Sequence, residues 1–140
     1  MSESGLLAID THIWIWLSFG TPGLKPEARR LIAEAGSRGD LMLPAICPWE
    51  VALLTSKRRL ELHMPVRDWV HRSLALPGLH LAPITPDIAV EACYLPGDFH
   101  GDPADRLIVA TARVEGATLV TRDAGIVAYG RAGHLSVLAA

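Results

Sequence analysis

Acidic side chains follow three apolar segments of this chain, close to the point where each segment ends. They are Asp10, Glu50 and Asp123. Two further carboxyl groups, Asp102 and Asp105, stand at the start of the stretch that leads into the last of these segments. Hard divalent cations prefer oxygen ligands, and Mg²⁺ uses a few carboxylates while it keeps several waters. Neighbouring carboxylates repel one another. If these carboxyl groups come together in the fold, we therefore expect them to be either protonated or bound to a metal ion.

A metal ion held by such a set supplies one kind of chemistry. It activates a water molecule as a nucleophile and offsets the charge that grows on a phosphoryl group. A second ion about 4 Å away would hold the leaving oxygen. No histidine, serine or cysteine accompanies the acids consistently. The residue types therefore indicate phosphodiester hydrolysis with Mg²⁺ or Mn²⁺ as the cofactor.

Apolar runs that alternate with helical patterns position these acids. Such short, continuously apolar runs between helices imply a parallel sheet covered on both faces. We predict one α/β domain over residues 1–140 with roughly five parallel strands. The predicted strands are residues 6–9, 41–46, 79–84, 117–121 and 135–138. The predicted helices are 11–19, 26–35 with Gly36 just past its end, 48–59, 65–76, one from 85 onward and 102–116, with a break at 20–23.

Ligands of open α/β sheets bind in the crevice beyond the carboxyl ends of the strands. The acids that end or follow the predicted strands fall at that edge. After the third strand the comparable acid is Asp87, which Thr85 and Pro86 place at the start of a helix.

The composition limits the class of protein. Half of the residues are apolar and a fifth are charged, which is typical of a globular chain with a proper core. Thirteen basic and fifteen acidic residues give a net charge of −2, which argues against a broadly basic nucleic-acid coat. That charge is compatible with a nuclease, because a metal-binding cluster of carboxylates lowers the net charge of any such enzyme.

The location predicted from the sequence is the cytoplasm. Residues 1–4 are acidic and polar where a signal peptide is basic, and the apolar stretch 13–19 is too short to span a membrane. Cys47 and Cys93 lie in apolar surroundings without paired spacing, and we interpret both as reduced thiols of the core. The spacing of cysteines and histidines does not fit a zinc site.

Four stretches of the chain resemble the PIN-domain family, and most closely its VapC toxin branch. They occur in the family's order and together span nearly the whole chain. The stretches are residues 7–12 (LAIDTH), 46–53 (ICPWEVAL), 100–108 (HGDPADRLI) and 119–123 (LVTRD).

This resemblance implies a three-layer α/β/α fold whose first strand is central and is flanked by the second and fourth. The third strand would lie near an edge, which reduces Asp87 to a helix-start residue. One pocket would then collect the catalytic and metal-binding residues, which are Asp10, Glu50, Asp105 and Asp123.

The resemblance also implies an activity and partners. The protein would be a metal-dependent endoribonuclease and the toxin of a VapBC-type pair, with a VapB-like antitoxin that blocks the acidic pocket. A homodimer or a hetero-oligomer with the antitoxin is expected. The helices predicted within residues 48–76 carry more apolar residues than one hairpin needs, which favours a groove for a partner helix. These residues are Leu53, Leu54, Leu60, Leu62, Met64 and Trp69.

Each acid also has a purely structural interpretation. Asp10 either binds metal or caps the helix that follows it, a task that Thr11 would then share. Glu50 either binds metal or favours a helix dipole. In the pair near the last helix start, Asp105 is taken as the ligand and Asp102 mainly as the cap, although Asp102 can still reach a metal through water.

The remaining candidates are weaker. Asp123 is either the outermost ligand or a turn residue, and the hydroxyls of Thr11 and Thr121 either orient the acids or serve as plain cap and strand groups. For Arg106 three roles are open: it binds a phosphate, it pairs with a carboxylate, or it lies on a helix surface without a specific role. Lys57, Arg58 and Arg59 either contact an RNA backbone or suit the end of a helix.

Histidines and tryptophans add little to this hypothesis. His12 and His100 are not favoured as catalytic groups. For Trp14, Trp16 and Trp69, packing in the core or at an interface is favoured over stacking on bases.

Other functions remain open at this point. The same pocket suits a small-molecule metal-dependent phosphohydrolase, and a non-catalytic PIN-like binding module is a further alternative. A phosphoacceptor receiver domain fits poorly, because Asp10 has no acidic neighbour and no lysine follows Lys57. Neither a P-loop nor a dinucleotide fingerprint occurs.

Overall fold

Five parallel strands form the sheet in the computed structural model, which describes residues 5–20 and 23–140. The order β3-β2-β1-β4-β5 places β1 in the centre with β2 and β4 beside it, and β3 at an edge, as the sequence resemblance implied. All four pairings are parallel. The strands are β1 (Leu7–Ile9), β2 (Leu41–Pro44), β3 (Leu79–Ala82), β4 (Thr118–Thr121) and β5 (Val137–Ala139).

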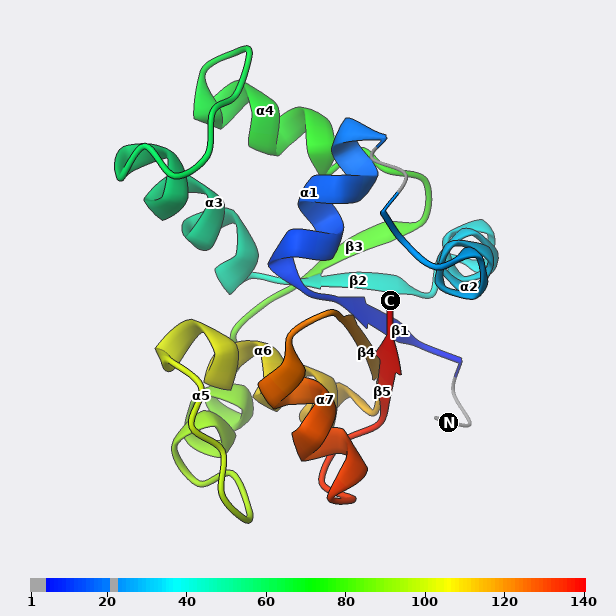
Figure 1. The fold of residues 1–140 in the computed structure, drawn as a ribbon, viewed down its shortest axis with the longest axis vertical. Helices are drawn as coiled ribbons and strands as arrows, with labels where there is room; N and C mark the ends of the chain where they lie inside the picture. Colours follow the sequence, from blue (N-terminus) through cyan, green and yellow to red (C-terminus); the bar gives the residue numbers. More distant parts are fainter. Residues whose placement is uncertain (1–4, 21–22) are drawn as a thin grey trace.

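Helices cover the two faces of this sheet, which confirms the three-layer α/β/α prediction (Figure 1). One side carries α1 (Thr11–Phe19), α3 (Ile46–Ser56) and α4 (Val66–Ser73). The other side carries α5 (Pro86–Cys93), α6 (Pro103–Glu115) and α7 (Ala124–Arg131). The remaining helix, α2 (Pro26–Arg38), packs against β2.

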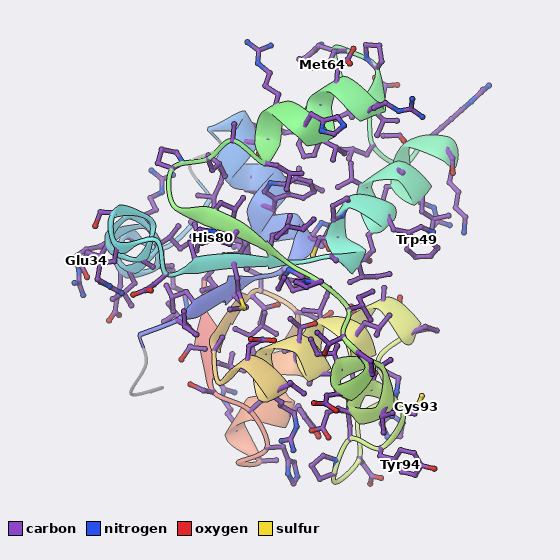
Figure 2. The ribbon with its side chains drawn as sticks, turned by 180° about the vertical axis from the view of Figure 1, so that it is seen from behind. Glu34, Trp49, Met64, His80, Cys93 and Tyr94 are labelled. Carbon is purple, nitrogen blue, oxygen red and sulfur yellow. The ribbon has the colours of Figure 1, made fainter. Side chains whose placement is uncertain are left out.

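The central strands are buried on both faces, and the edge strand is not. Ala8, Ile9 and Leu119 are fully buried, because helices close over β1 and β4 from both sides. On β3, in contrast, His80 is exposed and Leu81 is 47% exposed; Figure 2 shows His80 on this strand. The prediction of a sheet covered on both faces is therefore wrong at this edge.

Tryptophans contribute to the core beneath α1 and α4. Trp14 is completely buried, and its ring lies 4.9 Å from that of Trp69 in an edge-to-face arrangement. The indole Nε1 of Trp14 donates a hydrogen bond to the carbonyl of Ser73 at 3.0 Å. The core-packing interpretation is thus confirmed for these two tryptophans.

One prediction about a glycine and one about a cysteine are wrong. Gly36 lies inside α2, which continues to Arg38 and ends at Gly39 in the left-handed region. A Cβ on Gly36 would lie 2.8 Å from the carbonyl oxygen of Pro77, so the close approach of the two segments explains why this position is a glycine.

Of the two cysteines predicted to be core thiols, Cys93 is exposed, whereas Cys47 is buried. Because α5 buries Ile88 and Ala92, position 93 falls on its outer face (Figure 2).

Several boundaries differ from the predicted ones. The helix α1 matches its predicted range, whereas α3 begins two residues earlier than predicted, at Ile46. The helix α7 was not predicted. Part of the predicted break at 20–23, and the polar start at 1–4, lie outside the described residues. Within the described ranges, no helix is long and apolar enough to cross a membrane.

Candidate metal centre

The turns that leave the carboxyl ends of the strands place the acids. Asp10 comes directly after β1 and caps α1, accepting a hydrogen bond from the Thr11 amide at 2.6 Å. Asp123 comes after β4 and caps α7, accepting from the amide of Ile126 at 2.9 Å. Glu50 lies near the start of α3, which follows β2. Three strands in the middle of the sheet therefore each deliver one carboxyl to the same edge.

The fourth and fifth carboxyls come from the start of α6. Asp102 caps this helix by accepting a hydrogen bond from the amide of Asp105 at 2.9 Å, and Asp105 lies in the first turn. The predicted capping role of Asp102 is observed. Because Asp102 Oδ1 is engaged with the backbone, the Asp105 carboxyl is the group of this pair that projects without a hydrogen bond in the described part of the chain.

Two threonine hydroxyls hold the inner acids in place. Thr121, completely buried on β4, donates to Asp10 Oδ2 at 2.6 Å. Thr11 donates to Glu50 Oε1, also at 2.6 Å. The cap of α1 is thus Asp10, and the Thr11 hydroxyl turns instead to Glu50. The first contact ties the Asp10 carboxylate to β4, and the second ties the Glu50 carboxylate to α1. Hydrogen bonds of this kind orient the residues that bind a metal.

Burial and the repulsion of neighbouring acids raise the pKa values of Asp10, Glu50 and Asp105. Asp10 is 5% exposed, and burial raises its pKa while the hydrogen bonds from Thr121 and Thr11 lower it. Burial also raises the pKa of Glu50, against the lowering effect of its bond from Thr11. The pKa of Asp105 is raised to about 7, first by burial and then by Asp102, Asp10, Asp123 and Glu50 in that order. The structure therefore brings the other four predicted acids within electrostatic reach of Asp105.

The donor set fits a hard divalent cation. All five groups offer oxygen, which Mg²⁺ and Mn²⁺ prefer. Among the main influences on the pKa of Asp10 and Glu50, His12 is the one of a cationic type. The main influences on the pKa of Asp105 are burial and the four other acids, all of which raise it. The negative charge is therefore not balanced by the protein itself, and a cation would balance it.

The side chains are gathered but not closed around an ion. In residues 5–20 and 23–140, no three of them stand in a metal-ligating arrangement. The carboxylates of Asp10 and Glu50 point at threonine hydroxyls, and those of Asp102 and Asp123 point at backbone amides. Asp10 uses both of its oxygens in hydrogen bonds to Thr11 and Thr121, whereas Glu50, Asp102 and Asp123 each use one identified oxygen.

We expect Thr121→Val to weaken metal binding about tenfold or more, as loss of an orienting partner does. The valine is similar in shape but removes both the donor to the buried Asp10 Oδ2 and the acceptor of the Asp123 amide, at a cost of about 1–3 kcal/mol in unfolding free energy. Mn²⁺ titration and thermal unfolding measure the two effects. Thr111→Val is the matched control, because this buried hydroxyl bonds only to the Leu107 carbonyl of its own helix. Equal Mn²⁺ affinities in the two variants would contradict the orienting role.

Arg106 has a different environment from the one predicted. Its Nε donates to the carbonyl of Ala92 at 2.8 Å and its Nη1 donates to that of Phe99 at 2.9 Å. These bonds tie the end of α5 and the loop before α6 to α6 itself. Arg106 is thus a structural anchor of that loop, and the structure shows it on backbone carbonyls, not on a carboxylate.

The weaker candidates lie at the margin of the acid cluster. Lys57, Arg58 and Arg59 are exposed at the end of α3, about 10 Å along the helix axis from Glu50. Trp49, the neighbour of Glu50, is 53% exposed; Figure 2 shows it at the start of α3.

A cleft next to the acids was not anticipated. Its volume is about 540 Å³, and it extends from Asp102, Asp105 and Asp123 along one face of α7. Sequence reasoning missed it because the two glycines of residues 124–131 obscured the helical pattern of α7. The signal that would have found it is the spacing of Gly125, Ala128 and Ala132 on one helical face.

Sequence comparison agrees with this fold. A family profile for the PIN domain matches residues 7–132, and the chain belongs to the PIN-domain family. It is 37% identical over 115 residues to Ribonuclease VapC22 of Mycobacterium tuberculosis, covering 82% of this chain and 85% of that protein. The resemblance to the VapC branch is thereby confirmed.

Solved structures share the fold at lower identity. A chain in the crystal structure of VapBC2 from Rickettsia felis bound to a promoter DNA fragment matches with a TM-score of 0.67 and 16% identity, over 95% of this chain and 97% of that one. A chain in a toxin–antitoxin complex from Klebsiella pneumoniae matches with a TM-score of 0.62 and 22% identity, over 95% and 96%.

Proposed function

We propose that this protein is a metal-dependent endoribonuclease that uses Mg²⁺ or Mn²⁺ and serves as the toxin of a VapBC-type pair. One observation carries the proposal: carboxyls that follow β1 and β4 and carboxyls of α3 and α6 converge, and burial together with their repulsion raises the pKa of Asp105 to about 7. A protein has little structural reason to accumulate uncompensated charge in this way. The 37% identity to a ribonuclease supports RNA as the substrate.

In this proposal Asp10, Glu50, Asp105 and Asp123 hold the cation, and Asp102 caps α6 and contacts it through water. Thr121 and Thr11 keep the inner carboxylates turned toward the ion. A bound divalent cation would supply an activated water and offset the charge that develops on the scissile phosphate. Lys57, Arg58 and Arg59 would attract the RNA backbone from the end of α3.

The proposed partner is a VapB-like antitoxin, and the proposed location is the cytoplasm. Among the described residues, a hollow of about 400 Å³ lies between the end of α1 and α4, lined mainly by apolar side chains. Phe19, which is 45% exposed, borders it together with Met64 and Trp69. This hollow and the partly buried Leu54, Leu60 and Leu62 support an apolar helix as the docking element. A homodimer is proposed by analogy with the family.

Metal removal tests the proposal. Protein treated with a chelator should not cleave single-stranded RNA, and adding Mg²⁺ or Mn²⁺ should restore cleavage. The same ions should raise thermal stability, by about 3 kcal/mol at a concentration a hundredfold above Kd, because they bind only the folded state. Cleavage that persists without metal would contradict the proposal. Hydrolysis of a generic phosphomonoester without cleavage of RNA would instead support a small-molecule phosphohydrolase.

A further inference from the structure

A cleft begins at Asp102, Asp105 and Asp123 and continues beyond them, and most of the residues that line it are not proposed metal ligands. One wall is the loop of residues 98–101, and the other is the exposed face of α7 formed by Gly125, Ala128 and Ala132. The helix α7 lies beside α6 on the same side of the sheet (Figure 1). The volume of about 540 Å³ is in the range of small-ligand sites, which span roughly 300–1,000 Å³.

Hydrogen bonds fix the loop wall before any ligand arrives. Arg106 binds the carbonyl of Phe99, and the hydroxyl of Tyr129 donates to the carbonyl of Pro96 at 2.5 Å. Gly101 lets the chain pass close to α6, since a Cβ there would lie 2.8 Å from the Cβ of Asp105. Preformed sites lose less free energy on ordering when a ligand binds.

Beyond the proposed metal site, the charges in the cleft do not favour a second phosphate and suit a flat, uncharged group. Its charged lining residues are Asp98, Asp102, Asp105 and Asp123, and neither lysine nor arginine lines it in the described part of the chain. Along α7 the lining is small and apolar, so a planar ring can lie against the helix. At the rim, the Asp98 carboxylate is suited to accept a hydrogen bond from an exocyclic amine of a base.

Aromatic rings border the same space. The rings of Phe99 and Tyr129 lie 5.0 Å apart, and that of His134 lies 4.9 Å from Tyr129. All three residues line the cleft. Tyr129 is 3% exposed, whereas Phe99 and His134 are half-buried, so these two rings are the ones available to a nucleobase. Nucleobases stack on exposed aromatic rings whatever their sequence.

We propose that this cleft receives the nucleobase next to the scissile phosphate, which makes the substrate a single-stranded or looped RNA with one unstacked base at the cut. This inference rests on the proposed ribonuclease function. A duplex would have to extrude the base at a cost of a few kcal/mol. Specific recognition of RNA mostly uses such unpaired bases.

Filling the cleft tests the inference. Ala128→Phe places a ring on an exposed position of α7 that lies in the cleft and outside the acid cluster. Ala89→Phe, at an exposed position of α5, is the matched control. The substrates are a short single-stranded RNA with one mapped cleavage site and two copies of it, each with an abasic nucleotide on one side of the cut. Single-turnover cleavage and Mn²⁺ affinity are measured.

We expect Ala128→Phe to cleave the intact RNA about tenfold more slowly than wild type, with unchanged Mn²⁺ affinity. The wild type should also cleave one of the two abasic RNAs about tenfold more slowly than the intact RNA. On that abasic RNA, Ala128→Phe and the wild type should cleave at the same rate. Ala89→Phe should behave as wild type throughout. Additive effects of Ala128→Phe and the abasic nucleotide, or no effect of either, would overturn the cleft as a base site. RNA cleavage that is unaffected by metal removal would instead overturn the ribonuclease proposal itself.

Discussion

Asp10→Asn is expected to lower RNA cleavage by roughly 100-fold or more, because the substitution removes a negative oxygen ligand from the centre of the cluster. The fold should tolerate it. Asparagine has the shape of aspartate, its carbonyl oxygen can still accept from the amide of Thr11, and the Thr121 hydroxyl can rotate to accept from its NH₂ group. Single-turnover cleavage of single-stranded RNA at saturating Mg²⁺ measures the effect.

Asp87→Asn is the matched control for this experiment. Asp87 also lies in the first turn of a helix, α5, but that helix follows the edge strand β3 and not a central strand. The control variant should cleave as wild type does. In cells, expression of wild type and Asp87→Asn should arrest growth, while Asp10→Asn should be harmless. Cleavage by Asp10→Asn at the wild-type rate would remove the metal-centre hypothesis.

Asp105→Asn is expected both to abolish cleavage and to stabilise the metal-free protein at pH 8. In the folded chain the pKa of Asp105 is about 7, and in an unfolded chain it is close to 3.8. The shift of about three units corresponds to about 4 kcal/mol for a fully shielded group. Solvent screening of this partly buried carboxyl reduces the expected gain to about 1–2 kcal/mol, or about 3–8 °C in Tm.

The direction of the pH dependence follows from the raised pKa. Between about pH 4 and pH 7 the folded state binds the Asp105 proton more tightly than the unfolded state does, so stability falls as the pH rises. Below pH 4 the wild type and the variant should unfold at similar temperatures, and above pH 7 the difference should be complete. Saturating Mg²⁺ should remove the difference by stabilising the wild type.

Thermal unfolding across this pH range measures the prediction. Asp87→Asn again serves as the control, and it should be neutral or slightly destabilising because it removes an acid from a helix N-terminus. Destabilisation by Asp105→Asn at pH 8 without metal would show that the carboxylate is compensated by groups of the chain, which would contradict an unfilled cation site.

The acids were predictable because each one lies within a few residues of the end of an apolar run or the start of a helix in the sequence. Asp10 after β1 and Asp102 before α6 illustrate this, since strand ends and caps are local features. Asp105 could be named only through the resemblance to a family, because locally it is indistinguishable from Asp87 in a first helical turn. Position in the sheet, not local sequence, separates the two.

Errors in the prediction also have tertiary causes. Gly36 has the local pattern of a helix end, but the close passage of Pro77 requires a glycine inside the helix. Arg106 has the pattern of a surface arginine, but the loop before α6 supplies two backbone carbonyls for it. Pro77 is far from Gly36 in sequence, and the two partners of Arg106 lie 7 and 14 residues before it, which is beyond the reach of helix and turn rules.

By itself, the sequence determined the alternation of strands and helices, the parallel sheet and the positions of acids at strand ends, because hydrophobic periodicity and capping are local properties of the chain. The strand order, the hydrogen bond from Thr121 to Asp10, the pKa of Asp105 and the cleft along α7 were decided only by the tertiary structure. Each of these depends on distances between segments far apart in sequence, and packing of the whole chain sets those distances.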